Sequence, residues 1–145
     1  MFLHAHLQID QRENEGITIL DLNGKLEMDN GDNTLRDLVE SLFDQGNRQL
    51  ILDFAHVSEI DTAGIGVLLF LAQKYRAAGG RLALFQLSHV HTKIYEMARL
   101  ETVIEIYANE IDAVNSFFPD RAVAHYDILD YVESHVPHES QSDKK

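Results

Sequence analysis

The sequence predicts an α/β domain: a mixed, mostly parallel sheet of about five strands, opened by a β-hairpin and accompanied by four main helices. The first observation is the order of the predicted elements. Short β-rich runs alternate with segments whose apolar residues recur at helical spacing, which gives the order ββαβαβαβα. The second is composition: 145 residues with 45% hydrophobic and 25% charged side chains suit one globular domain. The third is the absence of cysteine, which excludes disulfides, thiolate metal sites and cysteine nucleophiles.

Two β-rich runs predict the opening hairpin. Residues 3–10 alternate apolar and polar side chains, the period of a half-buried strand. Residues 17–22 form the second run, after a polar stretch, and Asn23-Gly24 follows it as a turn signal. Antiparallel pairing of the two runs is therefore expected.

The next elements alternate helix and strand. Residues 29–32 form a polar loop that can cap a helix, and this helix ends at Gly46. Its apolar stripe comprises Leu35, Leu38, Val39 and Leu42. Residues 50–54 are short and apolar enough for a central strand that is buried on both faces. A second helix, which stops at Gly79-Gly80, carries Ile65, Leu68, Leu69 and Ala72.

The remaining elements complete the alternation. Residues 82–85 predict a strand, and residues 88–98 a helix that Ser88 can cap. Residues 103–107 predict the last strand, and residues 111–118 the last amphipathic helix. The domain is thus expected to span residues 1–118. Residues 119–145 are expected to form an acidic, partly flexible C-terminal extension.

Charge narrows the classes of partner. The chain has 24 acidic and 12 basic side chains, and its formal charge is −12. A field of this sign repels nucleic acid and anionic membrane surfaces, so neither is an expected partner. The longest apolar stretch, residues 65–72, is too short to cross a bilayer, and the N-terminus shows no secretory leader. The expected location is the cytoplasm.

A hydroxyl side chain stands where the central strand meets the following helix. Thr62 lies beside the free amide donors of that helix, so it can cap them, with Asp61 complementing the helix dipole. The same positive helix end can alternatively hold a phosphate placed on the hydroxyl. Gly64 and Gly66 each cost about 1 kcal/mol relative to alanine inside a helix. They indicate a close approach by a neighbouring segment or by a partner.

Residues 61–66, Asp-Thr-Ala-Gly-Ile-Gly, resemble the Asp-Ser-(Ser/Thr)-Gly-Leu-Gly signature of STAS domains in bacterial anti-sigma factor antagonists. Residues 24–27, Gly-Lys-Leu-Glu, are similar to the family's turn after its second strand. Residues 79–82, Gly-Gly-Arg-Leu, resemble its Gly-Gly-x-Leu before the fourth strand. Residues 103–107 and the helix after them resemble its closing elements. The resemblance covers about residues 3–118.

The resemblance implies a switch at Thr62. In the antagonists the hydroxyl residue after the aspartate is phosphorylated by a partner that is both anti-sigma factor and serine/threonine kinase. The unphosphorylated antagonist binds this partner and releases the sigma factor, which regulates sigma-factor-dependent transcription. The implied partner-binding residues are Glu27, Asp61, Thr62, Ala63, Gly64 and Gly66. The chain departs from the family pattern with threonine as phosphoacceptor, Ala63 in place of the second hydroxyl and Glu27 in place of aspartate.

As substrate of the phosphoryl transfer, the chain is expected to be no enzyme and to have no catalytic residues, cofactor or metal. ATP, Mg²⁺ and the catalytic base would belong to the partner, and a phosphatase is a possible further partner. The sequence contains neither GxxxxGK[ST] nor GxGxxG after a strand, so no nucleotide pocket is predicted.

Two other classes of function stay open. One is a constitutive STAS interaction subunit of a phospholipid transporter or stress-signalling complex, in which Thr62 is a contact and is never phosphorylated. The other is an enzyme that uses a carboxylate cluster, whose candidate members are Glu27, Asp29, Asp32, Glu59 and Asp61. The HxH pairs at His4 and His6 and at His89 and His91 are interpreted as solvated side chains rather than metal ligands.

Overall fold

The computed structural model of the chain describes residues 7–28, 31–86 and 104–123. In these ranges five strands form one sheet in the order β1-β2-β3-β4-β5, with β1 antiparallel to β2 and the other pairs parallel. The strands are β1 (Gln8–Asn14), β2 (Ile17–Leu26), β3 (Gln49–Ile60), β4 (Arg81–Phe85) and β5 (Glu105–Tyr107). The helices are α1 (Asp32–Asp44), α2 (Thr62–Ala77) and α4 (Glu110–Asn115). The predicted α/β class, mixed sheet and opening hairpin are confirmed.

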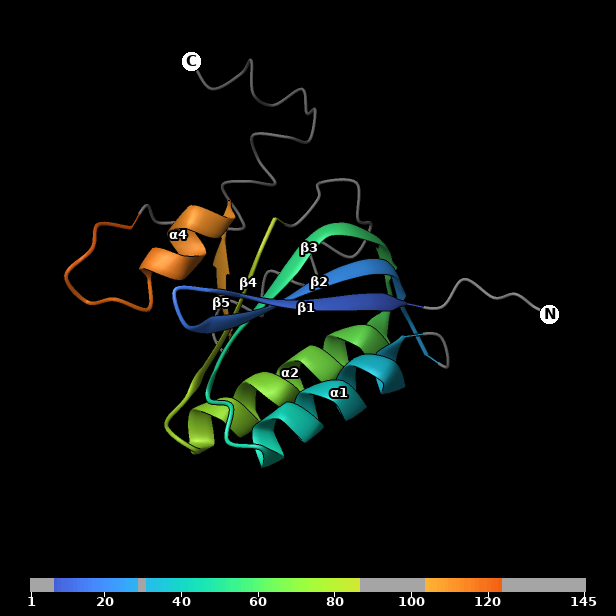
Figure 1. Cartoon of the computed structure of the whole chain (residues 1–145). Helices are drawn as coiled ribbons and strands as arrows, with labels where there is room; N and C mark the ends of the chain where they lie inside the picture. The colour runs from blue at the N-terminus through green and yellow to red at the C-terminus, as the bar shows by residue number, and fades with distance from the viewer. Residues whose placement is uncertain (1–6, 29–30, 87–103, 124–145) are drawn as a thin grey trace, which may run out of the picture.

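Helices α1 and α2 lie side by side on one face of the sheet, and α4 lies on the opposite side (Figure 1). Helix α1 connects the parallel strands β2 and β3, and α2 connects β3 and β4. Both crossovers step in the same direction across the sheet, so their common right-handedness puts both helices on one face. No helix in the described part of the chain is long and apolar enough to cross a membrane.

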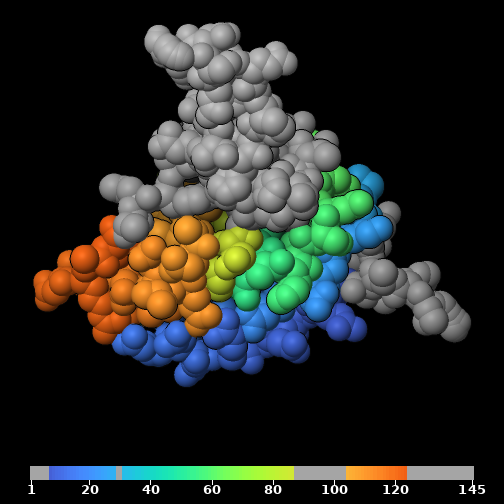
Figure 2. All heavy atoms as spheres, turned by 90° about the horizontal axis from the view of Figure 1, so that it is seen from above, coloured from blue at the N-terminus to red at the C-terminus, as the bar shows by residue number. Residues whose placement is uncertain are grey.

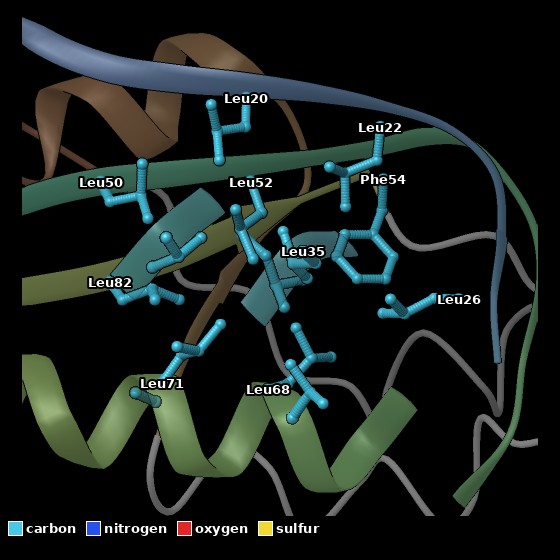
Figure 3. Close-up of a cluster of buried hydrophobic side chains, with 14 of the residues drawn as sticks. Leu20, Leu22, Leu26, Leu35, Leu50, Leu52, Phe54, Leu68, Leu71 and Leu82 are labelled. Carbon is cyan, nitrogen blue, oxygen red and sulfur yellow. The ribbon is translucent and has the colours of Figure 1, made fainter. Parts of the chain in front are cut away.

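The main core lies between the sheet and these two helices. Leu68 and Leu71 of α2 point from the helix toward the sheet, where Leu50 and Leu52 of β3 lie (Figure 3). All four side chains are fully buried, as is Leu35 of α1. Burying a leucine side chain contributes about 1.5–3 kcal/mol, so this layer fixes α2 firmly on the sheet.

A second core and a polar clamp hold α4 against the other face. Ile51 of β3 packs with Val114 of α4 in a smaller buried cluster. Arg12 of β1 bonds Asp21 of β2 through Nε at 2.6 Å, and its two terminal nitrogens bond the carboxylate of Glu110 at 2.9 Å. Figure 2 views this face, and α4 lies there beside the N-terminal strands. One guanidinium therefore joins the hairpin to the last helix.

The boundaries of the hairpin differ from the prediction. Strand β1 covers residues 8–14 and so ends four residues later than predicted, and the turn falls at Glu15-Gly16, where φ is 54° and 84°. Residues 3–6 of the predicted strand lie outside the described residues. The predicted turn at Asn23-Gly24 is wrong. These residues continue β2 to Leu26, and they pair with β3 across register shifts that the positive φ of Gly24, 128°, accommodates.

Strand β3 is longer than the predicted residues 50–54, because its second half continues to pair with β2 as far as Ile60. The fourth strand and the last strand and helix are found close to their predicted positions. The helix predicted over residues 88–98, and the residues from 124 on, lie outside the described residues, so three of the four predicted helices are seen. Both HxH pairs also lie outside them.

Candidate functional site

Asp61 joins three segments at the edge where β2 and β3 end. Its backbone N–H donates to the carbonyl oxygen of Leu26, the last residue of β2, at 3.3 Å. Its carboxylate accepts two further bonds, from the N–H of Gly64 in α2 at 2.9 Å and from the N–H of Met28 in the loop after β2 at 3.2 Å. One side chain therefore ties the loop to the first turn of α2.

Asp61 is the N-cap of α2, so the expectation that Thr62 caps this helix is wrong. The extended backbone of Asp61, with φ −116° and ψ −174°, suits a capping residue whose side chain turns back onto the third helical N–H. Partial burial acts to raise the pKa of Asp61, but the backbone N–H groups of Gly64, Met28 and Ala63 together lower it below the ordinary 3.8. Asp61 is therefore ionised at neutral pH.

Thr62 is the first residue of α2 and its side chain is exposed. Because Asp61 takes the capping role, the hydroxyl is not used by the helix, and no hydrogen bond engages it in the described part of the chain. A hydroxyl in this place is accessible to a partner. It also lies at the positive end of a 16-residue helix, where an anionic group is favoured.

The two glycines of the motif have different surroundings. An ideal Cβ on Gly64 would lie 2.3 Å from the carbonyl oxygen of Leu26, so only glycine allows α2 to start this close to β2. A Cβ on Gly66 would meet nothing within 4 Å, and Gly66 is exposed. The close approach expected at both glycines is thus explained within the chain at Gly64 alone.

The loop between β2 and α1 forms the second half of the site. Glu27 is partly exposed, and its carbonyl oxygen accepts bonds from the N–H groups of Gly31 and Asp32 at 3.0 and 3.2 Å. These bonds turn the chain into α1. Met28 follows Glu27, and its side chain is 64% exposed next to the Asp61 cap. The bond from Met28 to Asp61 thus brings the Glu27 segment to the start of α2.

The described carboxylates among those considered for catalysis do not form a metal-binding group. In residues 7–28, 31–86 and 104–123, no group of three or more histidine, aspartate or glutamate side chains is placed to hold a metal. Asp32 lies in the first turn of α1 and Glu59 is exposed near the end of β3, whereas Asp29 lies outside the described residues.

A shallow groove beside Thr62 was not predicted from the sequence. It has a volume of about 330 Å³ and lies between the N-terminal halves of α1 and α2. Its lining residues are Asp32, Arg36, Ala63, Gly66, Val67 and Phe70. Phe70 lies in the apolar stretch of residues 65–72 but outside the predicted apolar stripe of the helix, and it is 45% exposed. Its spacing of four residues from Gly66, on the face that carries Thr62, is the signal that could have placed it here.

Comparison with known proteins shows that residues 8–113 match the STAS domain, and the chain belongs to this family. It is 24% identical over 109 residues to the anti-sigma F factor antagonist of Paenibacillus polymyxa, an alignment that covers 75% of this chain and 93% of that protein. The fold is similar to that of an anti-sigma factor antagonist from Mycobacterium paratuberculosis, with a TM-score of 0.65, 13% identity and coverage of 76% and 92% of the two chains.

The fold is also similar to that of the anti-sigma factor antagonist SpoIIAA in two states. The unphosphorylated form gives a TM-score of 0.60 at 16% identity and covers 79% of this chain and 99% of that one. The phosphorylated form, from Bacillus, gives 0.57 at 20% identity and covers 77% and 98%.

Proposed function

We propose that this protein is an anti-sigma factor antagonist whose Thr62 corner binds a kinase-type anti-sigma factor and is switched off by phosphorylation of Thr62. The observation that carries the proposal is that Asp61 and Thr62, although neighbours, have different roles. Asp61 caps α2, and Thr62 stands at the exposed first position of the helix with a hydroxyl that no described residue engages in a hydrogen bond. Family membership and the antagonist relative support the same role.

The chain would act as the substrate of the phosphoryl transfer. The oxygen of Thr62 attacks the γ-phosphorus of ATP held by the partner, its proton passes to the partner's base, and ADP leaves. The chain therefore needs no cofactor of its own. Asp61 holds the first turn of α2 in place and Gly64 lets that turn pack on Leu26, while Glu27, Ala63 and Gly66 offer surface around the hydroxyl.

Phosphorylation would disrupt binding through charge. A phosphate on Thr62 adds about −1.5 to −2 charges at neutral pH. It would stand next to the carboxylate of Asp61, which is negatively charged at neutral pH, on a chain with a formal charge of −12. A partner surface that packs against the neutral hydroxyl would have to bury this dianion, and an uncompensated buried charge costs about 3–5 kcal/mol. The domain itself need not refold.

Within this proposal, residues 1–118 form the binding domain and residues 119–145 an acidic extension outside it. The protein would act in the cytoplasm, where sigma factors and their regulators meet. A phosphatase that hydrolyses the phosphothreonine would complete the cycle.

The test uses three variants at one position and a purified kinase-type anti-sigma factor from the same genome. Thr62→Ala should bind this partner by calorimetry and resist phosphorylation, whereas Thr62→Glu should fold but bind at least tenfold more weakly. Ser41→Glu is the matched control, because it adds the same charge at an exposed position of α1 away from the corner. Equal binding of Thr62→Glu and Ser41→Glu would contradict the switch and favour a constitutive interaction subunit.

A further inference from the structure

The groove between α1 and α2 continues the exposed surface of Thr62. Thr62, Gly66 and Phe70 are spaced four residues apart and therefore lie along one face of α2. All three are exposed. Gly66 and Phe70 also line the groove, with Asp32 and Arg36 of α1 on its other side. The N-terminal ends of both helices lie at the same end of the molecule (Figure 1).

Gly66 leaves the groove open, although glycine is a poor helix former. Glycine is the least favourable helical residue after proline. Gly64 is required by the Leu26 carbonyl, but nothing lies within 4 Å of a Cβ on Gly66. Any larger side chain at position 66 would instead fill the space between Ala63 and Phe70. The packing of this chain therefore does not require glycine at position 66. A partner side chain that enters the groove would require it, because only glycine leaves this space empty.

Two large apolar side chains are exposed at this end of the molecule. Among the described residues, the large hydrophobic side chains that are exposed are Met28, Phe70 and Ile111. Phe70 lines the groove and Met28 lies beside the Asp61 cap, whereas Ile111 lies on α4 across the sheet. Exposed aromatic and methionine side chains are enriched at the centres of protein interfaces.

The charges around this surface are mostly acidic. In the described segments that form it, the acidic residues are Glu27, Asp32, Asp37, Glu40, Glu59 and Asp61, and the basic ones are Lys25, Arg36 and Lys74. The ammonium of Lys74 lies 5.9 Å from the centroid of the Phe70 ring and 3.5 Å from the carboxylate of Glu40, so acidic groups still predominate. Arg36 donates to Asn33 and lies 3.9 Å from Asp37, so its charge is partly balanced within the chain. A partner that covers this end would therefore need net positive charge around the apolar contact.

We infer that the groove over Gly66 receives an apolar side chain from a basic surface of the kinase-type anti-sigma factor, with Phe70 as the anchoring contact. The inference rests on the proposed function and adds a second contact two turns of α2 beyond Thr62. This contact would determine which partner is bound. The switch at Thr62 would then act beside a fixed anchor.

The test measures affinity for the purified anti-sigma factor by calorimetry, with the full chain and three variants. Phe70→Ala should weaken binding at least tenfold, because it removes an aromatic anchor. Gly66→Leu should weaken binding to a similar degree by filling the groove, although its thermal unfolding midpoint should not fall. Ile111→Ala is the matched control and should change the affinity less than twofold, since it removes an exposed apolar side chain on the other face.

The outcomes separate this inference from the proposed function. If Thr62→Glu weakens binding while Phe70→Ala and Gly66→Leu bind like the unaltered chain, the groove inference is wrong and the switch stands. If Phe70→Ala and Ile111→Ala weaken binding equally, the anchor is not specific to the groove, and the inference is again wrong. If the unaltered chain binds no kinase-type anti-sigma factor of its genome, both are overturned.

Discussion

The two glycines of the motif should respond to alanine with opposite signs. At Gly66 the new methyl group meets open space, so the variant gains helix propensity alone, about 1 kcal/mol of unfolding free energy. At Gly64 the Cβ would lie 2.3 Å from the Leu26 carbonyl oxygen, which is backbone and cannot swing away. Overpacking of this kind costs about 1–3 kcal/mol and outweighs the propensity gain. The two variants should therefore differ by about 2 kcal/mol.

Urea unfolding followed by far-ultraviolet circular dichroism measures this difference, because the chain has no tryptophan to report it by fluorescence. Gly66→Ala should raise the midpoint and the melting temperature, the latter by about 2–4 °C, while Gly64→Ala should lower both. Equal shifts of the same sign would refute the claim that α2 begins in close contact with β2. They would also remove the reason for assigning Gly66 to the groove.

Three further predictions concern the charged groups. Asp61→Ala removes the cap of α2 and should lower the unfolding free energy by about 0.5–2 kcal/mol. Asp61→Asn keeps a capping oxygen and should be about as stable as the unaltered chain. If urea unfolding shows equal losses for the two variants, the capping role is contradicted. Burial and the neighbouring Asp21 raise the pKa of Asp53, so its contribution to stability falls as pH rises from the ordinary value of 3.8 to the raised one. Asp53→Asn should therefore raise the urea midpoint at neutral pH and leave it unchanged below the ordinary pKa; a lower midpoint at neutral pH would oppose this. Hydrogen bonds from Arg12 lower the pKa of Asp21 and of Glu110, although partial burial acts in the opposite direction. The stability that these carboxylates contribute is therefore fully present above their ordinary pKa values of 3.8 and 4.5. It is lost as the pH falls through their lowered pKa values in the folded chain. Arg12→Met should remove that acid-dependent loss, and an unchanged pH profile of unfolding would show that the clamp is energetically silent.

Hydrophobic periodicity predicted the alternation of elements because each helix and strand buries a regular face. Periodicity did not predict the second half of β3, which is held by pairing with β2. The second half of β3 buries Val57 and Ile60, three residues apart, so no period of two marks it as a strand. It is extended because β2 pairs with it there. The same pairing overrides the turn preference of Asn23-Gly24.

The candidate site was predicted in position but not in detail. Asp61 and Thr62 are both good capping residues, and a shift of one residue in the start of a helix cannot be decided from sequence patterns. The choice matters, because it decides which of the two side chains faces outward. The exposure of Phe70 escaped prediction for another reason: α2 is apolar on most of its circumference, so its sequence does not show which face the sheet and α1 leave open.

The most direct test of the account compares the unaltered chain before and after phosphorylation. The chain is incubated with the purified kinase-type anti-sigma factor, ATP and Mg²⁺, the modified residue is located by peptide mass spectrometry, and both forms are titrated into fresh partner by calorimetry. A single phosphate on Thr62 and a loss of affinity of about hundredfold or more are expected, since 3–5 kcal/mol corresponds to that range. A phosphate on any other residue, or equal affinity of the two forms, would contradict the switch at Thr62.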